Sequence, residues 1–257
     1  MSDHTLLQVQ PEYDRRDEWL ALAREEGLGF EVIELSSPPA LNESGRFELC
    51  EKWYGECKNV TSFHGSFIDV NPASGDAVVS EHSIKRCHES CLAAKRLGAE
   101  NIVFHSSCYP YLRGAYLDNW SAKCAAFYDM LADSYGLNIF VENCADPTPY
   151  SLVALMKRCE NSRVGICLDL GHANYSNASM EQWFEELGEW IGYLHLSDNT
   201  GSFDDHLCLG KGSVDWEKGN ELYRKLGRVL PMTLEVGGIG SVKESIDHLK
   251  KTGFFIN

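Results

Sequence analysis

Side chains that commonly bind metal ions recur in this sequence at the ends of short apolar runs. Seven segments share the arrangement: apolar residues, then a ligand-type side chain, then turn residues. The ligand-type residues are His64, His105, Glu142, Asp169, His172, His195, Asp204, His206 and Glu235. Imidazole nitrogen and carboxylate oxygen hold zinc, manganese and iron in proteins. The pattern therefore indicates a site for at least one divalent metal ion.

One segment, DLGH at 169–172, carries two of these residues close together. We expect Asp169 to end a strand and His172 to start the turn that follows it. Gly171 would allow the chain to bend sharply between them. Both side chains would then face the same cavity.

A second pair lies in DDH at 204–206, within a long stretch without an apolar run. Alternate residues of an extended loop face the same side, so Asp204 and His206 would chelate together. The alternative is that Asp204 and Asp205 are solvated loop carboxylates. A lone strand-end histidine is also more often structural than a ligand. Convergence favours the metal site, because charges gathered at one buried point must be paired or metal-bound.

The apolar runs alternate with amphipathic stretches, as βαβ units do. The predicted strands are 5–10, 30–35, 59–65, 101–106, 138–143, 164–170, 191–197 and 231–237. The predicted helices are 14–26, 80–97, 118–135, 148–160, 179–190, 215–226 and 241–252. We predict an α/β fold, a single (β/α)8 TIM barrel over residues 1–257, whose active sites form at the carboxyl ends of the strands.

Strand parity tests this prediction. If the strand-end ligands point into the barrel mouth, the residue two positions earlier points inward one layer below. Those residues are Ser62, Val103, Phe140, Cys167, Tyr193 and Thr233. None of them is charged, as the filling of a barrel requires.

The composition limits the class of protein. A chain of 257 residues with 44% hydrophobic residues can bury one large core. No apolar run reaches the length of roughly 18 residues that a membrane span needs. The acidic, polar N-terminus and ten cysteines without a CxxC pair predict a cytoplasmic protein with reduced thiols. A net charge of −15 argues against a nucleic-acid partner.

Two further residues are candidates for substrate contact. Lys211 follows the DDH segment and would meet a phosphate or a hydroxyl, although a surface lysine is the alternative. Glu34 ends the second predicted strand and would touch substrate, with a structural carboxylate as the alternative.

The motif series resembles a known superfamily over about residues 5 to 250. The motifs are HGSFIDVNPAS, IVFHSS, FVEN, CLDLGHA, LHLSDN, DDHLCLGKGSVDW and LEV, in this order. They are similar to those of the xylose isomerase-like TIM barrels, which include sugar isomerases and epimerases and the endonuclease IV enzymes. The series is specific for the superfamily and weak for the reaction.

The isomerase and epimerase branch implies one divalent ion bound by Glu142, Asp169, His195 and Glu235. By this resemblance Glu142 and Glu235 also form the acid–base pair, and His172 contacts substrate. The branch usually places an arginine just after the His195 strand, and this chain has none there.

The endonuclease IV branch implies three zinc ions held by all nine ligand-type residues. The loops depart from that branch, because CADPTP replaces the glycine-rich stretch after Glu142-Asn143. The HLxxGxGxVDW run is more typical of the sugar isomerases.

These observations favour a metal-dependent isomerase or epimerase of a ketose or aldose, or of its phosphate. Glutamate-mediated proton transfer would pass through a metal-stabilised enediolate. The alternative is an endonuclease IV-like multi-zinc phosphodiesterase acting on abasic DNA. The expected cofactor is manganese, zinc, cobalt or magnesium, as one core ion or as two or three ions. The expected ligand is a small sugar, and both a monomer and a homo-oligomer remain open.

Overall fold

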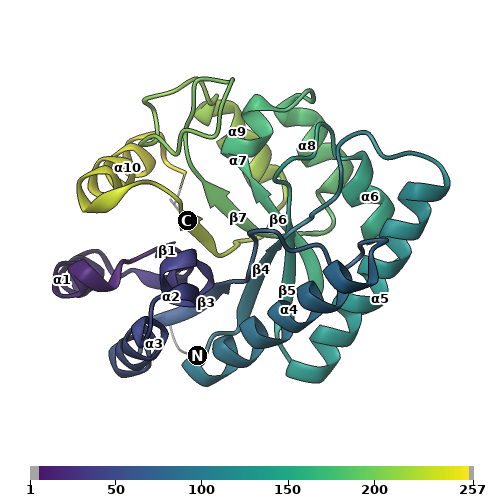
Figure 1. Ribbon diagram of the computed structural model, residues 1–257. Helices are drawn as coiled ribbons and strands as arrows, with labels where there is room; N and C mark the ends of the chain where they lie inside the picture. Colours follow the sequence, from purple (N-terminus) through teal and green to yellow (C-terminus); the bar gives the residue numbers. More distant parts are fainter. Residues whose placement is uncertain (1–5, 255–257) are drawn as a thin grey trace.

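The computed structural model describes residues 6–254 and shows a closed barrel of eight parallel strands (Figure 1). The strands are β1 Leu7–Val9, β2 Gly29–Val32, β3 Val60–His64, β4 Asn101–His105, β5 Asn138–Glu142, β6 Val164–Asp169, β7 Ile191–Leu196 and β8 Met232–Leu234. Each strand pairs with its neighbour in the sequence, and β1 closes the ring against β8. The predicted (β/α)8 barrel is therefore confirmed.

Helices surround the strands on the outside of the barrel (Figure 1). The longer helices are α1 Arg16–Glu26, α3 Arg46–Cys57, α4 Ala77–Leu97, α5 Ala115–Tyr135, α8 Met180–Leu187, α9 Trp216–Lys225 and α10 Gly238–Thr252. The shorter ones are η1 Tyr13–Arg15, η2 Glu34–Ser36, α2 Pro38–Asn42, α6 Tyr150–Met156 and α7 Leu170–Tyr175. No helix in residues 6–254 is long and apolar enough to cross a membrane.

The predicted set of helices lacks α3, which lies between β2 and β3 in the chain. This helix follows a left-handed glycine, Gly45, and begins without a side-chain cap, so the usual start signal is missing. It buries Cys50, Trp53 and Tyr54, and this packing stabilises the helix in the absence of a side-chain cap.

The second strand also ends earlier than predicted. It stops at Val32, because Ile33 takes a helical backbone conformation and turns the chain into η2. Glu34 therefore begins a short 3-10 helix instead of ending a strand. The first strand starts at Leu7, and residue 5 of its predicted range lies outside the described residues.

The barrel interior follows the predicted parity. Buried Val103, Phe140, Cys167 and Tyr193 pack together as a cluster separate from the main core. The hydroxyls of Ser62 and Thr233 lie 2.7 and 2.8 Å from the Tyr193 hydroxyl, in the same layer. The layer beneath the strand ends is thus formed by the expected side chains.

The main core lies between the strands and the surrounding helices. All ten cysteines of the chain fall within the described residues and are unpaired.

The backbone of Gly192 lies close to the ring of Phe140, and this contact provides a test of packing. A Cβ atom on Gly192 would lie 2.4 Å from the ring of Phe140, and one on Gly165 of the neighbouring β6 would lie 3.3 Å from the same ring. We expect Gly192→Ala to lower the free energy of unfolding by about 1–3 kcal/mol. A Cβ atom on Gly240 in α10 would have no described atom within 4 Å. Gly240→Ala should therefore raise the free energy of unfolding by up to about 1 kcal/mol. Urea denaturation measures both, and equal effects would contradict this account.

Candidate metal centre

The predicted ligand residues gather at the carboxyl end of the barrel, where six of them stand at or next to strand ends. His64, His105, Glu142 and Asp169 are the last residues of β3, β4, β5 and β6. His195 lies one residue before the end of β7, and Glu235 directly follows β8. Most of the nine residues line one cleft of about 850 Å³.

All nine candidate ligands fall into three groups whose ligand atoms lie within 4.8 Å of one another. We call them the core cluster, the inner pair cluster and the loop cluster. The core cluster is Glu142, Asp169, His195 and Glu235; the inner pair cluster is His64, His105 and Glu142; the loop cluster is His172, Asp204 and His206. Glu142 belongs to two clusters, so its carboxylate lies between them.

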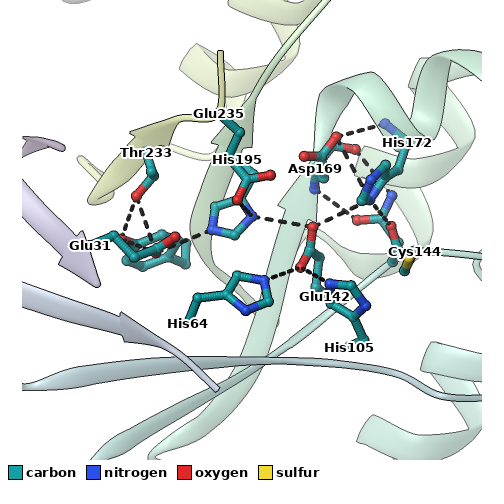
Figure 2. A network of polar contacts seen from close by, with 12 residues as sticks. Glu31, His64, His105, Glu142, Cys144, Asp169, His172, His195, Thr233 and Glu235 are labelled. Carbon is teal, nitrogen blue, oxygen red and sulfur yellow. Dashed lines mark hydrogen bonds and ion pairs between the residues drawn. The ribbon is translucent and has the colours of Figure 1, made fainter. Parts of the chain in front are cut away.

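Contacts in the core cluster converge on one ring nitrogen. Nδ1 of His195 lies 3.2 Å from Oε1 of Glu142 and 3.3 Å from Oε1 of Glu235. Glu142, Asp169 and His195 are fully buried, and Glu235 is nearly so. Figure 2 shows Glu142 at the middle of the network, with imidazole rings on several sides.

The inner pair cluster lies on the other carboxylate oxygen of Glu142. Oε2 of Glu142 is 3.5 Å from Nε2 of His64 and 3.4 Å from Nε2 of His105. The loop cluster is centred on Oδ2 of Asp204, at 3.3 Å from Nε2 of His172 and 3.1 Å from Nε2 of His206.

Backbone carbonyls fix the orientation of three histidine rings. In each, Nδ1 lies 2.7–3.0 Å from a carbonyl oxygen to which it can donate. The pairs are His64 with Gly65, His172 with Asn143, and His206 with Glu235. A ring that donates from Nδ1 presents the lone pair of Nε2, which in all three faces the cluster.

Asp169 is held by the helix that follows it. Its Oδ1 accepts a hydrogen bond of 2.6 Å from the backbone N–H of His172 and so caps α7. Gly171 lies inside α7 and serves close packing instead of a bend. A Cβ there would lie 2.2 Å from the hydroxyl oxygen of Ser197. The sharp turn expected at Gly171 is therefore wrong, while the convergence of Asp169 and His172 is confirmed.

The loop after β7 positions Asp204 and His206. Buried Asp198 accepts hydrogen bonds from the backbone N–H groups of Gly210 and Val214 and from the indole of Trp216. His206 takes a left-handed backbone conformation, with φ of 46°. The loop is thus tightly turned at His206 and not extended, although the two side chains meet as predicted.

Two buried oxygens test whether these residues fit a metal ion. Within residues 6–254, Oδ2 of Asp169 has no hydrogen-bond partner, and Oε2 of Glu142 has no hydrogen bond but only the ion-pair contacts to His64 and His105. Buried polar atoms are nearly always bonded, and a carboxylate without a partner is costly. The donor set consists of imidazole nitrogens and carboxylate oxygens, which zinc and manganese accept. The residues present therefore fit a divalent cation.

The carboxylates and imidazoles of the centre also shift one another's pKa values. Burial alone would raise the pKa of Glu142, but the neighbouring histidines hold it well below its usual range. Burial would likewise raise the pKa of Glu235, and His195 outweighs it and lowers that pKa to about 2. Burial raises the pKa of Asp169 to about 6.

Among the histidines, the pKa shifts have two directions. Burial lowers the pKa of His105 to about 4. The hydrogen bond to Asp204 raises the pKa of His206 to about 9. At neutral pH the loop cluster therefore carries a proton that a metal ion must displace.

The two predicted substrate contacts occupy different places. Glu34 lines the cleft, where its carboxylate accepts a 2.6 Å hydrogen bond from Arg46. Lys211 is 62% exposed and pairs with Glu244 at 3.3 Å, and it is not among the described residues that line the cleft.

Sequence reasoning missed Glu31, Gln10 and Arg46. Glu31 is a buried carboxylate of β2 beside His195, Gln10 follows β1, and Arg46 reaches the cleft from α3. A charged residue inside the otherwise apolar run of β2 was the available signal for Glu31.

The clusters predict which substitutions remove which ion. If the site binds more than one ion, His64→Ala should lose the ion of the inner pair cluster, and Asp204→Ala that of the loop cluster, while the core ion stays. Each variant should therefore hold about one ion fewer than the wild type, because each removes a ligand that the core cluster does not use. Metal analysis by atomic emission gives the count, with Lys211→Ala as control. Loss of all metal in either variant would contradict the division into clusters.

Metal affinity is expected to depend on pH. Because the pKa of His206 is raised to about 9, a proton must leave its ring below that pH before a cation can bind. Affinity of the loop cluster should therefore fall as the pH is lowered from 9, and binding at pH 7 should release protons. Titration calorimetry in two buffers of different ionisation enthalpy measures the release, with His248→Ala as control. An affinity that does not change between pH 6 and pH 9 would refute this.

Known proteins share both the sequence pattern and the fold. An uncharacterized protein of Methanocaldococcus jannaschii is 28% identical over 200 residues, which cover 73% of this chain and 68% of that protein. A probable endonuclease 4 of Thermoplasma acidophilum is 26% identical over 201 residues, covering 70% of this chain and 68% of that protein.

Solved structures with the same fold are less similar in sequence. A protein from Thermus thermophilus, soaked with zinc chloride, has a TM-score of 0.77 at 22% identity, covering 96% of this chain and 97% of that one. A D-psicose 3-epimerase with D-tagatose, from Clostridium cellulolyticum, has a TM-score of 0.71 at 15% identity, covering 98% and 99%. The sequence matches the family described as xylose isomerase-like TIM barrel over residues 4–252, and the chain belongs to that family.

Proposed function

We propose that this chain is a divalent-metal-dependent isomerase or epimerase of a small sugar or sugar phosphate. The observation that carries the proposal is the core cluster, in which Glu142 of β5 and Glu235 after β8 approach the same nitrogen of His195. Two carboxylates at one cation site suit the transfer of a proton to and from neighbouring carbon atoms. The fold neighbour that holds D-tagatose supports this choice of substrate class.

A divalent ion in the core cluster would supply Lewis acidity that stabilises negative charge on the substrate's carbonyl and hydroxyl oxygens. One of Glu142 and Glu235 removes a proton from carbon, and the other returns it. The histidines around them lower the pKa values of both, so both are ionised at neutral pH and either can accept the proton from carbon. The glutamate that returns a proton must first take one up from a substrate hydroxyl or from solvent. His172 lines the cleft with its Nε2 free of the backbone, so it can bind a substrate hydroxyl.

Charges around the cleft favour an uncharged polyol among these substrates. The cleft is also lined by the carboxylates of Glu12, Asp14, Glu34 and Glu43. Its arginines in the described residues are paired: Arg15 with Glu18, and Arg46 with Asp14 and Glu34. Duplex DNA draws most of its affinity from unpaired basic groups, so this rim is poorly suited to it.

One observation favours a second candidate, an endonuclease IV-like phosphodiesterase. Glu142 is shared by the core and inner pair clusters, and the nine ligand-type residues form three clusters. A carboxylate whose two oxygens face two cation sites is less available as a base. The similarity to a probable endonuclease 4 supports the same candidate.

Proton exchange with solvent separates the candidates. If Glu142 and Glu235 transfer a proton at carbon, a suitable ketose in deuterated water should gain deuterium next to its carbonyl group. Glu235→Gln should lower that exchange by about 10²–10⁴-fold, because it removes one member of the acid–base pair. Exchange is followed by NMR for a panel of ketoses and their phosphates, with Lys211→Ala as the control that keeps wild-type exchange. Metal-dependent nicking of an abasic oligonucleotide, without exchange on any sugar, would replace the isomerase with the phosphodiesterase.

A further inference from the structure

Glu31 is a buried carboxylate that belongs to none of the three clusters. It lies on β2 in register with Ser62 of β3, one layer below the strand-end ligands. Figure 2 shows its carboxylate beside the ring of His195, on the side away from Glu142. A charge at this depth needs a physical reason, because barrel interiors are filled mainly by apolar side chains.

The carboxylate of Glu31 is fully hydrogen-bonded. Its Oε2 accepts from the hydroxyl of Tyr193 at 2.9 Å and from that of Thr233 at 3.2 Å, and it lies 3.2 Å from Nε2 of His195. Its Oε1 accepts from the side-chain amide of Gln10 at 2.9 Å. Both oxygens are therefore held in one orientation, and one of them is directed at the histidine ring.

His195 is oriented differently from three of the other ligand histidines. His64, His172 and His206 place Nδ1 on a backbone carbonyl and turn Nε2 to their cluster. His195 turns Nδ1 to the core cluster, and its Nε2 meets Glu31. The nitrogen that His195 presents is thus decided by a side-chain carboxylate.

Gln10 extends the arrangement to a second ligand. Its amide nitrogen donates to Oε1 of Glu31 and also, at 2.5 Å, to Oε1 of Glu235. Glu235 is the carboxylate on the far side of Nδ1 of His195. Glu31 therefore contacts one core ligand directly and reaches another through a single amide.

We propose that Glu31 is a positioning residue of the metal centre. It accepts the Nε2–H of His195, so that the ring presents the lone pair of Nδ1 to the core cluster, and it makes that nitrogen a stronger donor. Through Gln10 it holds Glu235 at the same site. The inference rests on the proposed binding of a divalent ion by the core cluster. Carboxylates that bond the remote nitrogen of a ligand histidine typically affect metal affinity about 10–100-fold.

Zinc affinity tests the proposal without any assumption about substrate. Glu31→Gln keeps size and removes the negative charge, so zinc binding at the core cluster should weaken by about 10–100-fold. Glu31→Asp keeps the charge, and its affinity should lie between those of Glu31→Gln and the wild type. Competition with a chromophoric chelator measures the affinity, and thermal unfolding checks that each variant is folded.

Ser62→Ala is the matched control in the same layer. Its hydroxyl contacts Gln8 and Tyr193 but neither Glu31 nor His195, so its loss disturbs the polar layer and leaves the proposed contact intact. Zinc affinity should match the wild type. If Ser62→Ala weakens zinc as much as Glu31→Gln does, the effect belongs to the layer and the proposal fails.

NMR of histidine nitrogens supplies a readout that a merely structural role would not move. In zinc-loaded protein, His195 should show a metal-bound Nδ1 and a protonated Nε2. The Nε2 proton resonance should move upfield in Glu31→Gln and stay in place in Ser62→Ala. A protonated Nδ1 with a metal-bound Nε2 in the wild type would overturn the proposal.

The outcomes separate the two levels of inference. If the wild type binds no zinc, manganese, cobalt or magnesium, both the proposed metal centre and the proposed role of Glu31 are refuted. If the wild type binds zinc and Glu31→Gln binds it equally well, the role of Glu31 alone is refuted.

Discussion

Buried negative charge is the constraint on which the mouth of this barrel depends. Glu31, Glu142, Asp169 and Glu235 are all buried there. Such charges are tolerated only when they are paired, hydrogen-bonded or bound to a cation. In the described residues the arginines that line the cleft, Arg15 and Arg46, are already paired with other carboxylates. The ring of His195 contacts Glu31, Glu142 and Glu235. In residues 6–254 the buried carboxylate oxygens without a hydrogen bond belong to Glu142 and Asp169 of the core cluster.

The barrel satisfies this constraint by using its backbone as an anchor. Carbonyl groups at the strand ends accept the Nδ1–H of three histidines, and the first turn of α7 bonds one oxygen of Asp169. In each case one polar atom of a ligand is fixed, and the other is left for the cluster. Because the backbone at the strand ends fixes one polar atom of each of these ligands, the ligand side chains have defined orientations, as a metal site of defined coordination requires.

At β7 the orientation of His195 is set by side chains of the layer beneath it. Tyr193, Thr233 and Gln10 hold Glu31, and Glu31 holds His195. The polar residues inside this barrel are therefore part of one network with the strand-end ligands. The shared position of Glu142 connects that network to the inner pair cluster.

The sequence by itself determined the barrel and its nine ligand-type residues. The eight apolar runs, each ending in a turn, are local patterns that can be read directly from the sequence. Ser62, Val103 and Tyr193 lie inside the barrel, as the alternation of side chains along each strand requires. Only the tertiary structure decided how the ligands divide into clusters, because the strand order follows the sequence but the distances between ligand atoms of different strands do not. It also decided the role of Gly171, the place of Lys211 outside the cleft and the place of Glu31. The positions of these three residues depend on contacts between segments that are far apart in the sequence. Sequence patterns indicate only the direction in which a side chain points.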